Sequence, residues 1–100
     1  MRAKGGYIYI VSNKNRTVLY IGVTSDLYQR IWQHKNGMGS VFTNKYNCTD
    51  ILYYEFFQDI ESAIRREKLL KKYNRKWKED LIKSKNPQYE DIFDQIGDMR

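Results

Sequence analysis

Cysteine and proline are almost absent from this chain of 100 residues, which contains one of each, Cys48 and Pro87. A single cysteine excludes an internal disulfide and a cysteine-rich zinc site, and it suits a reducing compartment. No apolar run approaches the roughly 20 residues of a transmembrane helix, and the run after Lys4 is too short and too rich in tyrosine for a secretory signal. The sequence therefore predicts a cytoplasmic protein with no membrane partner.

Acidic residues are also scarce, because 12 aspartates and glutamates stand against 18 lysines and arginines, leaving a net charge of +6. A surplus of positive charge favours a polyanionic partner, and nucleic acid is the first candidate. A chain of this length can build one modest core and is too short for two. We therefore expect residues 1–100 to form a single domain.

The order of expected elements indicates an α+β fold. Tyrosine and β-branched residues predict a hairpin through the turn-like "SNKNRT" and one later strand. The strands are expected at about 7–12, 17–23 and 51–57. Helices are expected at about 27–36, 60–73, 75–84 and 87–96, and residues 38–49 are expected to be a loop. Asn86 followed by Pro87 is typical of a helix start, so Asn86 is predicted to cap the last helix. The result is a small three-stranded antiparallel sheet flanked by helices.

Three polar side chains fall on helix faces that should be apolar. Helical spacing places Arg30 and His34 on the same stripe as Leu27 and Ile31, and it places Glu67 on the buried face of the later long helix. A cation, an imidazole and a carboxylate are therefore expected to point toward the sheet. The alternatives remain open that the arginine and the carboxylate form one structural ion pair, and that the histidine is an ordinary buried one.

The hairpin is unusually rich in tyrosine. If its loop is symmetric and even-numbered, Tyr9 lies directly opposite Tyr20, and Tyr7 and Gly22 share their face of the sheet. A glycine on this face would leave space beside Tyr20 for a ligand or a helix backbone. The simpler alternative is that these tyrosines pack as strand residues with their hydroxyls in water.

The polar residues from four expected elements could line one cleft and hydrolyse a phosphodiester. Such chemistry needs an activated water, a cation against the developing negative charge, and usually a divalent metal held by hard oxygen ligands. Glu67 could hold Mg²⁺, Arg30 could bind the phosphate, and a phenol or His34 could take the proton. A tyrosine base needs its pKa lowered from about 10, which an adjacent arginine and a metal could supply.

These residues resemble those of the GIY-YIG nuclease superfamily. The resemblance rests on "YIY" at 7–9, "YIG" at 20–22, Arg30 and His34 on the next helix, and Glu67 within "AIRREKLLKK". It extends from Gly6 to about Ile92 and is greatest for small stand-alone bacterial members. The resemblance implies a three-stranded antiparallel sheet with surrounding helices, and hydrolysis of DNA that depends on a single divalent ion, Mg²⁺ or Mn²⁺.

The resemblance also implies a role for each residue of this set. Tyr9 corresponds to the general base, Tyr20 assists it or positions the water, and Arg30 stabilises the transition state. His34 takes part in proton transfer, and Glu67 is the metal ligand.

Other positions are supporting or depart from the family pattern. Tyr7, which replaces the family's glycine, and Gly22 are expected to support the site. Asn86 matches a late asparagine of the family, although its role as a helix cap competes with that assignment. Val23 and Thr24 stand where the DNA-repair branch carries a lysine, so phosphate neutralisation would depend more on Arg30 and the metal.

A basic belt on and after the helix of Glu67 is expected to hold backbone phosphates without reading sequence. It comprises Arg65, Arg66, Lys68, Lys71, Lys72, Arg75, Lys76 and Lys78. The alternative is a helix face made basic for solubility alone. Trp77 lies within the belt and could stack on an unpaired base, or it could pack between the last helices.

The resulting hypothesis is a metal-dependent DNA endonuclease, either weakly specific or selective for branched, nicked or damaged DNA. We expect no separate DNA-binding domain beside this module, so sequence-specific cutting would require a protein partner. Two alternatives stay open: a non-catalytic nucleic-acid binding or adaptor module with the same fold, and RNA as the substrate.

Overall fold

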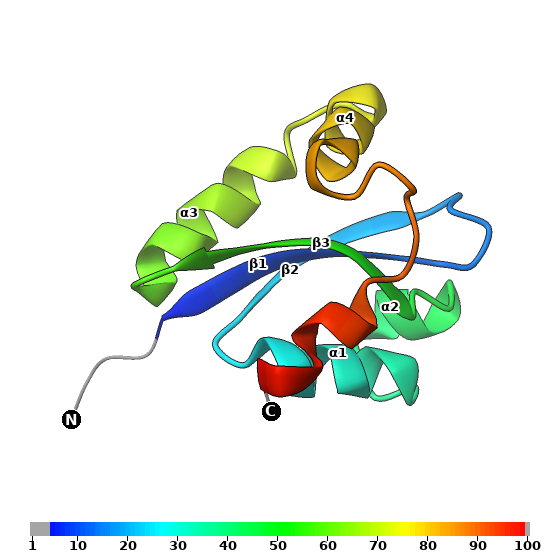
Figure 1. The fold of residues 1–100 in the computed structure, drawn as a ribbon, viewed down its shortest axis with the longest axis horizontal. Coiled ribbons are helices and arrows are strands. Elements are labelled where there is room, and N and C mark those ends of the chain that lie inside the picture. Colours follow the sequence, from blue (N-terminus) through cyan, green and yellow to red (C-terminus); the bar gives the residue numbers. More distant parts are fainter. Residues whose placement is uncertain (1–4, 100) are drawn as a thin grey trace.

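The computed structural model describes residues 5–99 and contains one antiparallel sheet with strand order β2-β1-β3. The strands are β1 (Gly6–Ser12), β2 (Leu19–Thr24) and β3 (Asp50–Phe57). One face of the sheet carries α1 (Leu27–Lys35), α2 (Val41–Lys45) and the 3₁₀ helix η1 (Phe93–Met99), and the other carries α3 (Ile60–Leu70) and α4 (Arg75–Lys85) (Figure 1). The predicted α+β fold is confirmed. Within residues 5–99, no helix has the length and apolar character needed to cross a bilayer.

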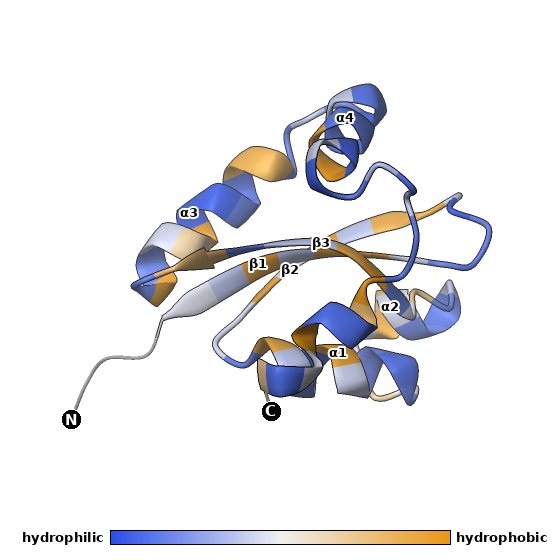
Figure 2. Ribbon diagram, viewed as in Figure 1, coloured by the Kyte–Doolittle hydropathy of each residue, from blue (hydrophilic) through white to orange (hydrophobic). Residues whose placement is uncertain are grey.

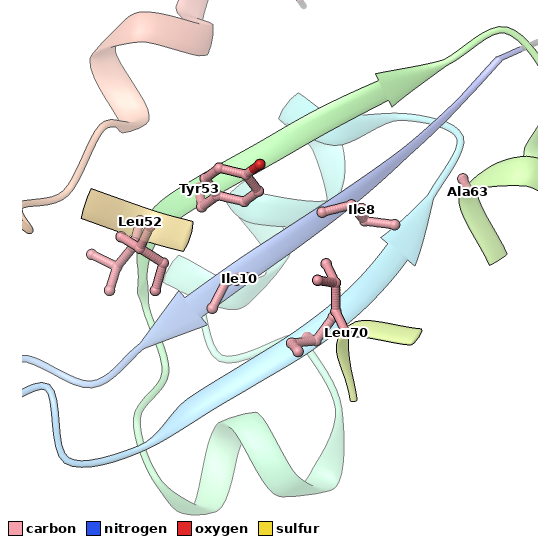
Figure 3. Close-up of a cluster of buried hydrophobic side chains, with 8 residues drawn as sticks. Ile8, Ile10, Leu52, Tyr53, Ala63 and Leu70 are labelled. Atoms are coloured by element: carbon pink, nitrogen blue, oxygen red, sulfur yellow. The ribbon is translucent and has the colours of Figure 1, made fainter. Parts of the chain in front are cut away.

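The central strand β1 is buried on both sides, because successive side chains of a strand point to opposite faces. Ile8 and Ile10 join the cluster under α3 and α4, whereas Tyr9 and Val11 join the cluster under α1 and η1. Figure 3 shows the first cluster, and Figure 2 shows hydrophobic colour along the sheet and hydrophilic colour over much of α4. Each face of the sheet therefore has its own core.

Side-chain caps fix where three helices begin. Asp26 caps α1, Asp59 caps α3, and Asn74 caps α4, each by accepting a hydrogen bond from a backbone N–H in the first turn. The predicted starts of these helices are confirmed. The predicted end of the long helix at 73 is wrong, because the chain tightens after Leu70 into a turn in which the N–H of Tyr73 bonds to the carbonyl of Leu70.

The predicted register of the hairpin is wrong by two residues. Tyr9 pairs with Gly22, and Tyr20 pairs with Val11. The cause is the loop, where the Oδ1 of Asn13 accepts bonds from two backbone N–H groups, those of residues 17 and 18, at 2.9 and 3.0 Å. These bonds centre the turn one residue later than a symmetric loop about 14 and 15. A shift of two residues keeps both tyrosines on one face.

The predicted loop at 38–49 contains the short helix α2. The Oγ of Ser40 accepts a bond from the N–H of Thr43, whose own hydroxyl accepts one from the N–H of Ser40. This reciprocal pair is a capping box with threonine in the place usually held by glutamate or glutamine. It is enough to start a helix of one turn, which is too short to show a period in the sequence.

The predicted helix at 87–96 is also wrong, and so is the role of Asn86 as its N-cap. Asn86 ends α4 instead, and its amide donates to the carbonyls of Leu52 and Glu90 at 3.0 and 2.8 Å. Tyr89 has a φ of 56°, and the N–H of Ile92 donates to Ile51 in β3 at 2.9 Å. A turn and bonds to the sheet therefore replace the expected helix, and only η1 is helical in this segment.

Candidate active site

Helix α1 brings Arg30 and His34 to the hydroxyl of Tyr9. The Nε2 of His34 lies 3.0 Å from that hydroxyl, and the Nε of Arg30 donates to it at 3.4 Å. Arg30 also donates to Gln33 at 2.9 Å, which holds the guanidinium on the helix surface. The helical spacing that predicted inward-pointing polar groups is therefore confirmed for these two residues, and the phenol of Tyr9 is their meeting point.

His34 is held from its other side by α2. The imidazole is 2% exposed, and its Nδ1 lies 3.1 Å from the Oγ1 of Thr43. That hydroxyl donates to the carbonyl of Ser40 at 3.2 Å. The hydroxyl of Thr43 has one proton, and it uses that proton in the bond to Ser40, so it can only accept from His34. We therefore assign the ring proton of His34 to Nδ1, which leaves Nε2 free to accept from Tyr9.

Burial sets the protonation state of both partners. Desolvation, helped by the charge of Arg30, lowers the pKa of His34 to about 4, so the imidazole is neutral near pH 7. Desolvation also raises the pKa of Tyr9, even though Arg30 lowers it. Arg30 thus lowers the pKa of Tyr9 as expected, but burial raises that pKa by more. The resting site therefore contains a neutral phenol hydrogen-bonded to a neutral imidazole.

Gly22 gives Tyr9 its position. A Cβ at Gly22 would collide with the ring and hydroxyl of Tyr9, so the phenol lies directly over the edge strand β2. The space that we expected beside Tyr20 is therefore filled by Tyr9. The Tyr20 ring lies 6.3 Å from the His34 ring, and Tyr7 packs against the rings of Tyr54 and Phe56. Tyr20 thus borders the site, whereas Tyr7 packs on aromatic residues of β3, and its supporting role stays a prediction.

Glu67 approaches from the other face of the sheet. It lies on α3, which packs over β1 and β2, and its carboxylate contributes to raising the pKa of Tyr9. Its side chain is 13% exposed and pairs with Lys71 at 2.7 Å. Arg30 and Glu67 therefore do not form the ion pair that the sequence left open, because Arg30 bonds to Tyr9 and Gln33 and Glu67 pairs with Lys71.

The resemblance implies a divalent metal held by Glu67. Across residues 5–99, no three or more histidine, cysteine, aspartate or glutamate side chains are grouped to hold a metal ion. Mg²⁺ commonly keeps several waters and takes one or two carboxylates together with substrate phosphates. A single partly accessible carboxylate fits that pattern, so Glu67 is compatible with one Mg²⁺ or Mn²⁺ once Lys71 releases it.

Asn86 lies elsewhere. It is 6% exposed, and its amide donates to the carbonyl of Leu52 in β3 and to that of Glu90 in the following segment. Asn86 thus has a structural role that accounts for its burial, as the residue that ends α4 and bonds to β3, and it does not start a helix. Its assignment to the active site stays a prediction.

The basic belt follows α3, the turn after it and α4, and ion pairs hold half of it. The pairs are Arg66 with Glu55, Lys71 with Glu67, Arg75 with Glu79, and Lys76 with Asp80. Arg65, Lys68 and Lys72 are exposed, and Lys78 is half-buried. Trp77 is 57% exposed and meets the Tyr73 ring edge-on, so packing between the last helices is wrong for it. Phosphate and base contacts by this surface stay predictions.

Two polar residues of the site were missed from the sequence. Thr43 contacts His34 directly, and Ser40 positions that threonine. Gly39 precedes them, and a Cβ there would press on both the His34 ring and the Thr43 hydroxyl. The combination of a serine with a hydroxyl residue three positions later was the available signal for a helix start.

Comparison with known proteins places this chain in a family. The model of the GIY-YIG catalytic domain matches residues 5–80. A UPF0213 protein of Clostridium perfringens is 37% identical over 91% of this chain and 97% of its own length, and one of Staphylococcus saprophyticus is 37% identical over 76% and 92%. The solution NMR structure of a UPF0213 protein from Bacillus halodurans is similar with a TM-score of 0.55 and 30% identity, covering 85% of this chain and 89% of that one.

Proposed function

Because the chain belongs to the GIY-YIG family, whose catalytic domain points to a nuclease-type function, we propose that it is a divalent-metal-dependent endonuclease that hydrolyses phosphodiester bonds in DNA. The observation that carries the proposal is the hydroxyl of Tyr9, which lies between the Nε of Arg30 and the Nε2 of His34. A buried phenol in contact with both a cation and an unprotonated imidazole is a proton-transfer arrangement.

The assigned hydrogen bonds set the direction of proton transfer, from a water through Tyr9 to His34. Water bound beside Tyr20 loses a proton to the phenol oxygen of Tyr9, while that phenol passes its own proton to Nε2 of His34. The hydroxide attacks phosphorus, the bond to the leaving oxygen breaks, and the leaving alkoxide takes a proton from solvent. The imidazolium of His34, whose pKa is lowered to about 4, then releases its proton to solvent and restores the neutral site. Because the pKa of Tyr9 is raised, this relay avoids a standing phenolate.

Charge stabilisation completes the proposed chemistry. Arg30 lies where negative charge develops next to Tyr9, and it would bind the phosphate in the transition state. Glu67 would hold the metal, which supplies further neutralisation of the phosphate when it is bound. The phenol lies over the edge strand, so a DNA strand crossing β2 could reach both faces of the sheet.

The basic belt supports an electrostatic mode of DNA binding that does not read sequence. The proposal therefore includes structure-selective or weakly specific cleavage of duplex, branched or damaged DNA, with a role in DNA repair, and a protein partner where sequence specificity is needed. We place the protein in the cytoplasm, which the free and buried thiol of Cys48 favours.

The decisive experiment incubates supercoiled plasmid and branched oligonucleotides with Mg²⁺ or Mn²⁺. We expect the wild-type protein to cleave. Tyr9→Phe and Arg30→Ala should each cleave about 10²-fold or more slowly, the usual loss for a general base or a charge-stabilising donor. Glu67→Ala should lose its response to the metal.

The matched control is Tyr53→Phe. Tyr53 is another buried tyrosine, 3% exposed and bonded to Glu55, but it lies on the face of α3 and α4. Its loss should leave cleavage unchanged. If no substrate is cut, and salt-sensitive binding survives Glu67→Ala, the chain is a binding module and the enzymatic proposal is wrong. RNA hairpins in the same assay test the alternative substrate.

A further inference from the structure

A row of aromatic rings leads away from the candidate active site across α2. Tyr20 stacks on Phe42 with ring centroids 5.6 Å apart, and Phe42 meets Tyr46 at 4.8 Å. The first of these rings is the one that borders His34. The row therefore begins at the site of the proposed chemistry and continues outward along one helix.

Packing within the molecule does not explain this row. Phe42 is 43% exposed and Tyr46 is 40% exposed, and the neighbouring Val41 is 88% exposed. The one buried residue of α2 is Thr43, which holds His34. A five-residue helix that buries a threonine and, with its C-cap Tyr46, presents two aromatic side chains to solvent is arranged for contact with something outside the chain.

Charge and size indicate what that contact is. The ammonium of Lys45 lies 5.3 Å from the centre of the Tyr46 ring, and the whole chain carries a net charge of +6. Aromatic faces interleaved with cations are the usual platform for unpaired nucleobases, whose phosphates meet the cations while the bases stack. Three rings are too few for a protein interface of standard size, so a second copy of the chain fits this surface less well.

We propose that the row of Tyr20, Phe42 and Tyr46 stacks an unpaired base next to the phosphate that is cut. The preferred substrates are then DNA molecules with bulged, flapped or gapped strands, and paired duplex is a poor substrate. This inference rests on the proposed nuclease function for the identity of the neighbouring phosphate. The stacking itself is a property of α2 and does not require catalysis.

The test measures binding in EDTA, where no cleavage occurs. Oligonucleotides carry 2-aminopurine either in a one-base bulge or in a matched duplex, and both fluorescence and anisotropy are recorded. The wild-type protein should quench the bulged probe. Phe42→Leu keeps the apolar bulk but removes the ring, so it should abolish the quenching and weaken binding to the bulge on the order of tenfold, the loss expected for one base stack. Binding to the duplex should not change.

Two variants act as controls. Trp32→Leu removes an equally exposed ring, at 43%, from outside the row, and it should bind both probes as the wild type does. Phe42→Tyr should restore the quenching. Circular dichroism of each variant checks that the fold is kept.

The inference is overturned if Phe42→Leu still quenches the bulged probe, or if it weakens binding to bulge and duplex equally. It is also overturned if sedimentation shows a dimer that Phe42→Leu dissociates while DNA binding stays unchanged. Selective stacking by a protein that cleaves nothing would reject the proposed nuclease and support the row. If Phe42→Leu cleaves DNA and keeps the wild-type preference for bulges, the nuclease is supported and the stacking role of the row is rejected.

Discussion

On the face of α3 and α4, the central strand contributes Ile8 and Ile10, both 0% exposed, to a cluster of buried and mostly aliphatic side chains. On the face of α1, the same strand contributes Tyr9, whose hydroxyl is bonded to a buried histidine and a half-buried arginine. The first arrangement mainly removes apolar surface from water, and its one phenol, that of Tyr53, donates to Glu55 away from the proposed site. The second removes polar groups from water and shifts their pKa values, which is unfavourable for stability and useful for proton transfer.

The comparison implies that stability and activity can be altered separately by changing one face at a time. Substitutions in the apolar cluster of the α3 and α4 face should lower the free energy of unfolding without changing the chemistry of each folded molecule, whereas Glu67 on the same face belongs to the proposed chemistry. Substitutions on the α1 face should change the chemistry, and some of them should also change how stability depends on pH.

The largest expected effect is that of Leu70→Ala on the α3 and α4 face. Leu70 is fully buried, so the truncation should lower the free energy of unfolding by about 2–5 kcal/mol. Urea unfolding measures this loss. Cleavage per folded molecule, measured well below the melting temperature, should match that of the wild type. A lowered rate per folded molecule would show that the two faces are not separable.

The next effect is the pH dependence contributed by His34, which is the only histidine of the chain and lies on the α1 face. Its folded pKa of about 4 lies below the usual 6.5, so folding disfavours its protonated form. The contribution is fully present above pH 6.5 and is lost as the pH falls from 6.5 toward 4, by on the order of 3 kcal/mol.

Urea unfolding of the wild type and of His34→Gln at pH 7.5 and 4.5 measures this contribution. The carboxylates titrate in both proteins, so the difference between their pH dependences reports the histidine. His34→Gln should lose less stability on acidification than the wild type. Equal losses in the two proteins would contradict the lowered pKa.

A smaller effect compares two glycines, one on each face. A Cβ at Gly6 would lie 2.6 Å from Cδ1 of Ile60 on the α3 face, and a Cβ at Gly22 would collide with Tyr9. Gly6→Ala and Gly22→Ala should each cost about 1–3 kcal/mol of stability through overpacking. Only Gly22→Ala should also reduce cleavage per folded molecule, because it displaces the phenol. Equal activity in both variants would argue against the position of Tyr9 described above.

The smallest effect concerns Thr43, which positions His34. Thr43→Val removes a hydrogen bond and should cost about 1 kcal/mol, and Thr43→Ser should restore it. The ¹⁵N shifts of the single histidine report its tautomer directly. They should show a protonated Nδ1 in the wild type and in Thr43→Ser, and a mixture of tautomers in Thr43→Val. A protonated Nε2 in the wild type would reverse the assigned direction of proton transfer.

Helical and strand periods were sufficient to predict the strands, α1 and the inward direction of Arg30 and His34. Period alone placed a cation and an imidazole against the sheet, and the structure brings both to Tyr9. The same reasoning placed Glu67 on the buried side of α3, where its side chain is 13% exposed. Repeating patterns over two or more turns are thus enough to locate most of the candidate site.

The features that were missed depend on single side chains. The hairpin register depends on Asn13, whose carbonyl oxygen organises the loop. The helix α2 depends on the reciprocal bonds of Ser40 and Thr43, within a segment too short to have a period. The expected final helix gives way to bonds between Asn86 and β3, which form only after the chain has folded. Local patterns carry no information about such distant partners.

The helix η1 has a consequence for where this domain can be cut or fused. The family match ends at residue 80, yet Ile92 and Ile96 lie in the same cluster as Leu27 of α1, and Phe93 stacks on Tyr28 at 5.2 Å. The last turn of the chain thus holds in place the helix that carries Arg30 and His34. A transplanted unit of this fold therefore has to include η1, and a fusion joined at residue 80 would leave α1 without its support.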